Sequence, residues 1–61
     1  MQKIVILEQV WDEVSQGFFE PGFTGELVEE SENSANVILN GQSLHIARDR
    51  YQIVPGDPIG N

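Results

Sequence analysis

The chain has 61 residues, with ten acidic and three basic side chains and a formal net charge of −7. Three cationic side chains are too few for the roughly 6–10 phosphate contacts of a typical DNA-binding protein, so direct binding of nucleic acid is disfavoured. The same charge is repelled by anionic membranes and favours encounter with a basic protein surface. At this length we expect one small domain. Because the chain has no cysteine, no disulfide or thiolate metal site stabilises it.

Residues 3–10 open with the run I-V-I-L, whose β-branched side chains favour a strand. The competing interpretation is a helix over residues 7–14. Its apolar side chains follow the i, i+3, i+4, i+7 spacing of an amphipathic helix: Leu7, Val10, Trp11 and Val14. We expect the strand, because the rest of the chain has β character. The apolar run I-V-I-L at residues 4–7 is too short for a signal peptide or a membrane span, so we expect a cytoplasmic protein.

Residues 12–22 contain two glycines, a proline and no sustained hydrophobic period. We therefore expect a long irregular loop. Phe18 and Phe19 are adjacent, so in an extended segment one of them points inward and the other outward. Pro21 and Gly22 suit the central positions of a type II turn, because proline fixes φ and glycine accepts a positive φ.

The next strand is expected over residues 23–29, F-T-G-E-L-V-E. A register with Phe23 and Leu27 facing the core leaves Glu26 in water, whereas the opposite register buries this carboxylate at a large desolvation cost. The polar residues 30–34, E-S-E-N-S, then suit a hairpin loop.

A hairpin is predicted over residues 35–47, where Asn40-Gly41 separates two apolar runs and tolerates the positive φ angles of a type I′ turn. Counting outward from this turn pairs Leu39 with Gln42, Ile38 with Ser43, Val37 with Leu44, Asn36 with His45 and Ala35 with Ile46. Alternation then collects apolar side chains on one face: Ala35, Val37, Leu39, Leu44 and Ile46. The other face is mostly polar, as a half-buried antiparallel sheet requires.

The last part of the chain begins with a short polar step at residues 48–50, followed by a brief strand at residues 51–54. Residues 55–61 contain two prolines and two glycines, and we expect a flexible tail there.

Short strands linked in order must curl to bury their apolar face, and closure of the sheet limits its exposed edges. We therefore predict an all-β fold, a small five-stranded antiparallel barrel over residues 1–54. The chain resembles an SH3-like barrel over residues 4–54, in its loop 12–22, the segment G-F-T-G-E-L-V-E, the hairpin turn at Gly41, the polar step 48–50 and the final strand. The segment from Gly22 to Gly41 is also similar to the glycine-bearing core of KOW-type motifs.

These two resemblances imply different functions. KOW modules are usually basic and contact RNA, and here the cationic residues for such contact are Lys3, Arg48 and Arg50. This chain departs from them in its acidic residues Glu26, Glu29, Glu30 and Glu32. Peptide-binding SH3 domains hold proline-rich segments in an aromatic-lined groove. The aromatic residues available for such a groove are Trp11, Phe18, Phe19 and Tyr51.

No residue pattern points to catalysis or to a metal. His45 shares a face with Ser43, but no third group is present to orient a nucleophile and base, so we interpret His45 as a surface residue. Glu29, Glu30 and Glu32 lack the spacing of a calcium loop. We expect no enzyme activity, no metal and no cofactor.

The aromatic residues have two interpretations, as core-filling side chains or as exposed anchors with an acidic rim. We predict a small acidic protein-interaction module or accessory subunit, which docks through residues 12–22 on a larger protein with a basic surface. The candidate partner-binding residues are Trp11, Asp12, Glu13, Phe18, Phe19 and Glu20. The alternative is an inhibitor that mimics nucleic acid through Glu8, Asp12, Glu13, Glu26, Glu29 and Glu30. The oligomeric state is left open.

Overall fold

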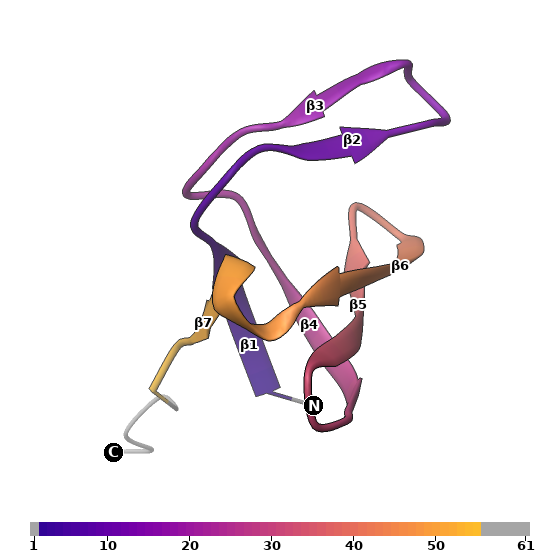
Figure 1. Ribbon diagram of the computed structural model, residues 1–61. Helices are drawn as coiled ribbons and strands as arrows, with labels where there is room; N and C mark the ends of the chain where they lie inside the picture. Colours follow the sequence, from indigo (N-terminus) through magenta and orange to yellow (C-terminus); the bar gives the residue numbers. More distant parts are fainter. Residues whose placement is uncertain (1, 56–61) are drawn as a thin grey trace.

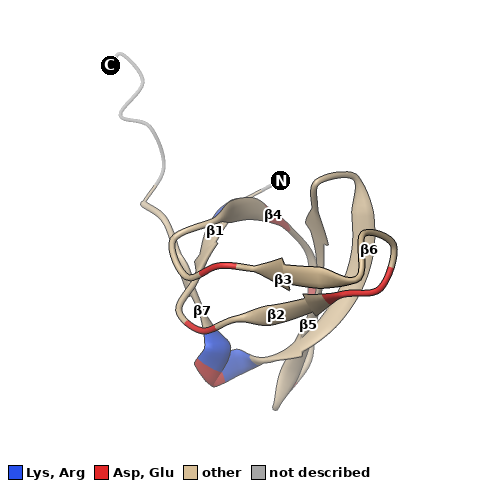
Figure 2. Ribbon diagram, turned by 90° about the horizontal axis from the view of Figure 1, so that it is seen from above, with Lys and Arg blue, Asp and Glu red and all other residues tan. Residues whose placement is uncertain are grey.

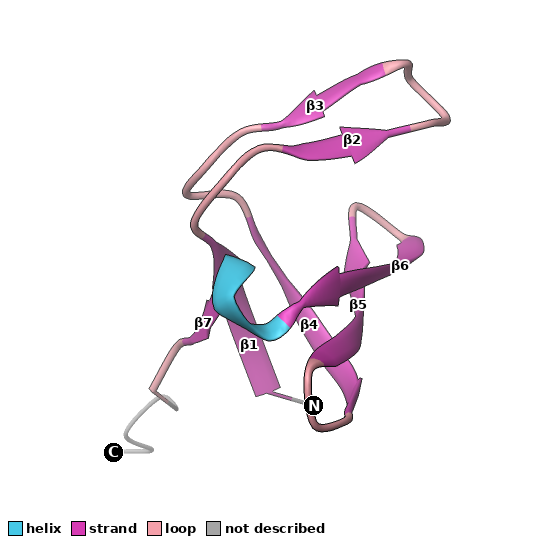
Figure 3. Cartoon of the chain, in the orientation of Figure 1, coloured by secondary structure: helices cyan, strands magenta, loops and turns pink. Residues whose placement is uncertain are grey.

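A computed structural model describes residues 2–55, in which seven β-strands and one short 3-10 helix form and no α-helix does (Figures 1 and 3). The elements are β1 (Gln2–Ile6), β2 (Val10–Asp12), β3 (Gly17–Phe19), β4 (Thr24–Glu30), β5 (Ser34–Leu39), β6 (Gln42–Ala47), η1 (Arg48–Arg50) and β7 (Tyr51–Ile53). The predicted all-β class is therefore confirmed.

The strands form two antiparallel sheets. Five strands pair in the order β6-β5-β4-β1-β7, and β2 pairs with β3 alone. The β2–β3 hairpin lies at one end of the molecule, away from the N-terminus (Figure 1). This hairpin connects β1 to β4, two strands that are neighbours in the larger sheet.

The strand predicted over residues 3–10 is too long. β1 ends at Ile6, and residues 7–9 carry the chain away from the larger sheet to the start of β2. The Leu7 N–H still donates to the carbonyl of Arg50 at 2.8 Å, one position beyond the last β1–β7 pair. The helix considered over residues 7–14 does not form, because β2 occupies the middle of that segment.

The prediction of an irregular loop over residues 12–22 is wrong. β2 and β3 form a hairpin whose turn comprises residues 13–16, with Gln16 at a positive φ of 58°. Each strand has only three residues, which is too short for a hydrophobic period to be visible in the sequence. The predicted turn at Pro21-Gly22 is confirmed: Gly22 has a φ of 97°, and the Phe23 N–H donates to the Glu20 carbonyl at 3.1 Å.

β4 is shared between β1 on one side and β5 on the other. Its predicted register is confirmed for Leu27, which is buried, and for Glu26, which is exposed, while Phe23 just before the strand remains 37% exposed. The pairing with β5 shifts between Leu27 and Glu29, an irregularity of the kind that bends a strand. At Gly25, β4 passes so close to β5 that no side chain fits between them.

The β5–β6 hairpin has every one of the five predicted pairs. Asn40 and Gly41 have φ angles of 53° and 80°, as a type I′ turn requires at both central positions. Residues 31–33 connect β4 to β5, a shorter connection than predicted, because β4 extends to Glu30 and β5 begins at Ser34. The core collects buried side chains from all seven strands: Ile4, Ile6, Val10, Phe19, Leu27, Ala35, Val37, Leu39, Ile46 and Tyr51.

β7 pairs with β1 and adds the second edge of the larger sheet. Tyr51 is buried, and its hydroxyl donates to Glu30 Oε2 at 2.6 Å. The same carboxylate oxygen lies 3.3 Å from Arg48 Nη2, so Glu30 joins the end of β4 to η1 and β7. Apart from Pro55, the tail predicted at residues 55–61 lies outside the described residues.

Candidate functional site

The β2–β3 hairpin has one buried face and one exposed face. Val10 and Phe19 point inward and are 9% and 6% exposed, whereas Trp11 and Phe18 point outward and are 49% and 52% exposed. Trp11 lies directly across from Phe18 in the strand register. Their ring centroids are 5.2 Å apart with an interplanar angle of 74°, an edge-to-face pair on the surface.

Asp12 belongs to the buried face and fixes the shape of the hairpin. Its Oδ1 accepts the N–H groups of Val14 at 3.0 Å and Ser15 at 3.3 Å, and its Oδ2 accepts the Ser15 hydroxyl at 2.6 Å. Gln42 Nε2, at the start of β6, donates to Oδ1 at 2.9 Å. These hydrogen bonds lower the pKa of Asp12, although burial alone would raise it. The bond from the Ser15 hydroxyl has the largest effect, and the bond from Gln42 the next largest.

Two exposed carboxylates flank the aromatic pair. Glu13 follows β2 at the start of the turn, and Glu20 follows β3 at the other end of the hairpin. Gln9 Nε2 lies 3.2 Å and 3.4 Å from the two carboxylate oxygens of Glu20, which restrains this side chain. No lysine or arginine occurs between residues 4 and 47, so the exposed face of the hairpin combines aromatic rings with negative charge.

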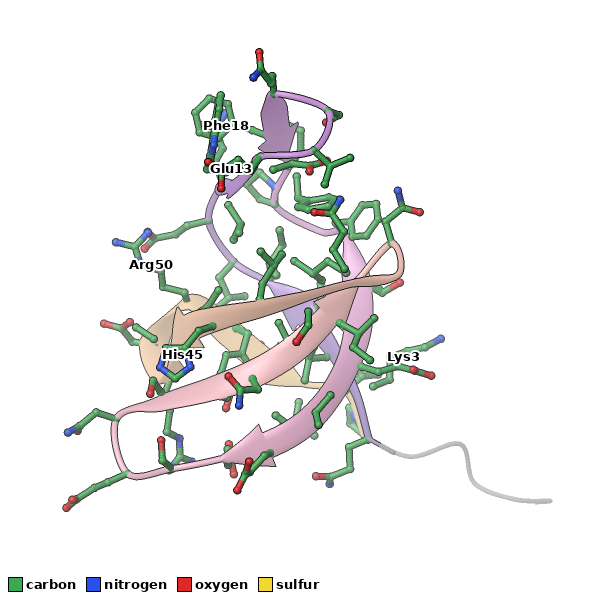
Figure 4. The ribbon with its side chains drawn as sticks, turned by 90° about the vertical axis from the view of Figure 1, so that its right-hand side faces the viewer. Lys3, Glu13, Phe18, His45 and Arg50 are labelled. Atoms are coloured by element: carbon green, nitrogen blue, oxygen red, sulfur yellow. The ribbon has the colours of Figure 1, made fainter. Side chains whose placement is uncertain are left out.

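The basic residues lie outside the β2–β3 hairpin (Figure 2). Arg48 and Arg50 belong to η1, and each is near a carboxylate, Arg50 Nη1 being 3.4 Å from Glu8 Oε1. Lys3 and Arg50 project from opposite sides of the molecule (Figure 4). The structure therefore does not bring together the three cationic residues that RNA contact of the KOW type would use.

His45 lies on the exposed face of β6, where its Nδ1 is 2.8 Å from the side-chain oxygen of Asn36. This is the cross-strand neighbour that the register predicts, and it is an amide rather than a carboxylate or a nucleophile. Among residues 2–55, no group of three or more histidine, aspartate or glutamate side chains is placed to hold a metal ion. Within the same range, no helix is long and apolar enough to span a bilayer.

Of the six predicted partner-binding residues, the structure places four on the exposed side of the hairpin and two inside it. The exposed ones are Trp11, Glu13, Phe18 and Glu20 (Figure 4 labels Glu13 and Phe18), and the buried ones are Asp12 and Phe19. Gln9 and Gln42, the two amides that hold Glu20 and Asp12, are not among the predicted site residues. Comparisons of the chain with family models, with curated proteins and with solved structures find no match.

Proposed function

We propose that this chain is a non-catalytic interaction module or accessory subunit, which docks on the basic surface of a larger protein through the exposed face of the β2–β3 hairpin. The observation that carries this proposal is the exposed pair of Trp11 and Phe18. Large aromatic side chains are the usual anchors of protein interfaces, because they bury much apolar area with few rotatable bonds. Neither ring is needed to fill the core, which Phe19 completes from the other face.

The scaffold we propose for this surface is an SH3-like barrel. Three features support it: the strand order β6-β5-β4-β1-β7, the hairpin between β1 and β4, and the 3-10 turn between β6 and β7. The bend in β4 between Leu27 and Glu29 further supports a sheet that curls around its core. Such a scaffold presents the hairpin at one end of the molecule, where Val10 and Phe19 attach it to the core.

The charge of the chain favours a basic partner. Opposite charge accelerates encounter and selects against acidic partners, while the aromatic pair would hold the complex after desolvation. A second copy of this chain is disfavoured as the partner, because it also carries a net charge of −7.

The experiment is a pull-down from the native host with the full chain as bait, in which the dependence on single substitutions is measured. We expect the captured partner to persist at moderate salt and to be lost with Trp11→Ala or Phe18→Ala. Val28→Ala is the matched control, because Val28 is also 49% exposed but lies on β4. Its variant should capture as much partner as the native chain.

Two outcomes contradict the proposal. If the aromatic variants capture the partner as well as the native chain does, the hairpin is not the docking surface. If moderate salt abolishes capture and both aromatic substitutions are harmless, the result supports the alternative, an inhibitor that occupies a nucleic-acid-binding protein through its carboxylates.

A further inference from the structure

The exposed face of the hairpin also indicates which side chain of a partner it accepts. We propose that Trp11 and Phe18 receive an arginine of the partner, whose guanidinium stacks on an exposed ring face and pairs with the carboxylate of Glu20. This inference rests on the proposed function and makes it more specific, because it assigns the chemistry of the contact.

The ring geometry leaves an aromatic face open to a cation. In an edge-to-face pair the edge of one ring covers part of one face of the other, and both rings here remain about half exposed. The π-face of an aromatic ring is electron-rich, and among aromatic side chains indole attracts cations most strongly. The pair therefore offers an electron-rich ring face rather than a purely apolar surface.

Glu20 supplies the counter-charge in a restrained position. The Gln9 amide nitrogen lies within hydrogen-bond distance of the Glu20 carboxylate, at 3.2 Å from Oε1 and 3.4 Å from Oε2. A carboxylate has about four lone-pair sites, so the contact with Gln9 leaves sites for the two parallel N–H groups of a guanidinium. Glu13, an exposed residue two positions after Trp11, adds a second negative charge at the turn end of the hairpin.

Arginine fits this combination better than lysine does. A planar guanidinium stacks on an aromatic face and pairs bidentately with a carboxylate at the same time, whereas an ammonium group is a strongly hydrated point charge. The chain does not supply such a cation itself between residues 4 and 47, and Arg50 already pairs with Glu8.

The hairpin is held in shape before any ligand arrives. Asp12 binds the turn through Val14 and Ser15 and joins the hairpin to β6 through Gln42. A surface that is already ordered loses little conformational entropy on binding, which favours recognition of a single side chain.

The test uses nuclear magnetic resonance of the full chain, titrated with a short peptide that is blocked at both ends and contains one arginine. Trp11 is the only tryptophan, so its indole N–H gives one unambiguous signal. We expect the arginine peptide to shift this signal in a saturable manner. The matched peptide with citrulline, which has nearly the same shape and no charge, should give a much smaller shift.

Three substitutions sharpen the test. Glu20→Gln removes the charge, and Phe18→Leu removes one ring while keeping an apolar side chain; each should weaken the apparent affinity about two- to fivefold. Glu26→Gln is the control, because Glu26 is an exposed carboxylate on β4. It should leave the affinity unchanged.

The proposal is overturned if citrulline or lysine peptides shift the indole signal as strongly as the arginine peptide does, or if Glu26→Gln weakens binding as much as Glu20→Gln. It is also overturned if the arginine peptide does not shift the signal. If pull-down still depends on Trp11 and Phe18 in that case, the proposed function stands and only the assignment of arginine fails.

Discussion

Replacing Gly25 of β4 by alanine should destabilise the protein more than the same replacement of Gly17 in β3. A Cβ at this position would lie 2.3 Å from the backbone oxygen of Ile38 and 2.4 Å from Cδ2 of Leu39, whereas ordinary contact begins at 3.4 Å. The carbonyl belongs to β5 and cannot rotate away. Because Leu39 is fully buried, its side chain cannot move out into solvent. β4 and β5 must therefore separate by about an ångström.

The size of this effect follows from the size of the domain. Overpacking a core by one methylene or methyl group typically costs about 1–3 kcal/mol, and we expect the upper value because a backbone atom is involved. A domain of this length seldom has more than about 3–5 kcal/mol of total stability. Gly25→Ala should therefore remove most of it and lower the Tm by more than about 12 °C.

Chemical denaturation followed by the fluorescence of Trp11 measures this change. Gly17→Ala is the matched control, because its added Cβ would lie 3.8 Å from the Ser15 hydroxyl oxygen, an ordinary contact. Its free energy of unfolding should stay within about 0.5 kcal/mol of that of the native chain. Equal midpoints for the native chain and Gly25→Ala would refute the close approach of β4 and β5.

Three further predictions concern single side chains. Tyr51→Phe removes the hydrogen bond to Glu30 and should lower the free energy of unfolding in urea by about 1–2 kcal/mol. Burial, and then this hydrogen bond, raise the pKa of Tyr51 in the folded state. The native chain should therefore lose stability as pH rises above about 10, and the Tyr51→Phe variant should not. The pKa of Asp12 is lowered in the folded state, so its contribution to stability is present above the unfolded pKa of 3.8 and is lost as pH falls below that value. Asp12→Asn should therefore reduce the pH dependence of the free energy of unfolding in this acidic range. An unchanged pH dependence would contradict the hydrogen bonds of the Asp12 carboxylate. Phe19→Ala should cost about 3–5 kcal/mol and Phe18→Ala about 1 kcal/mol or less in the same unfolding assay, and equal costs would contradict their opposite orientations.

The sequence predicted the β5–β6 hairpin in full because its signals are local. Asn40-Gly41 determines both the turn and the register, and each strand is long enough to show alternation. The β2–β3 hairpin lacks both signals: its strands have three residues each, and the positive φ in its turn falls on Gln16, a residue type that does not mark such turns. That segment therefore has the composition of a loop although it pairs as a hairpin.

The candidate surface was predicted in part for the same reason. The exposure of one of Phe18 and Phe19 follows from adjacency in an extended segment, but which of them is outside depends on the strand register. As a candidate partner-binding residue, Asp12 is predicted to be accessible, whereas its position two residues before the N–H of Val14 lets it accept bonds within the turn. The contact from Gln42 joins segments 30 residues apart, and no local pattern reveals it.

The alternation along β2 and β3 separates two demands on the same six residues. The inward-facing side chains pack in the core or bind the turn, whereas the outward-facing Trp11 and Phe18 are not part of the core. A library that varies only Trp11 and Phe18, together with Gln9, Glu13 and Glu20 beyond the strand ends, would therefore change what is recognised while the framework still assembles. The domain is therefore a compact scaffold for selecting new ligands, because its binding surface can be changed without changing the residues of its core.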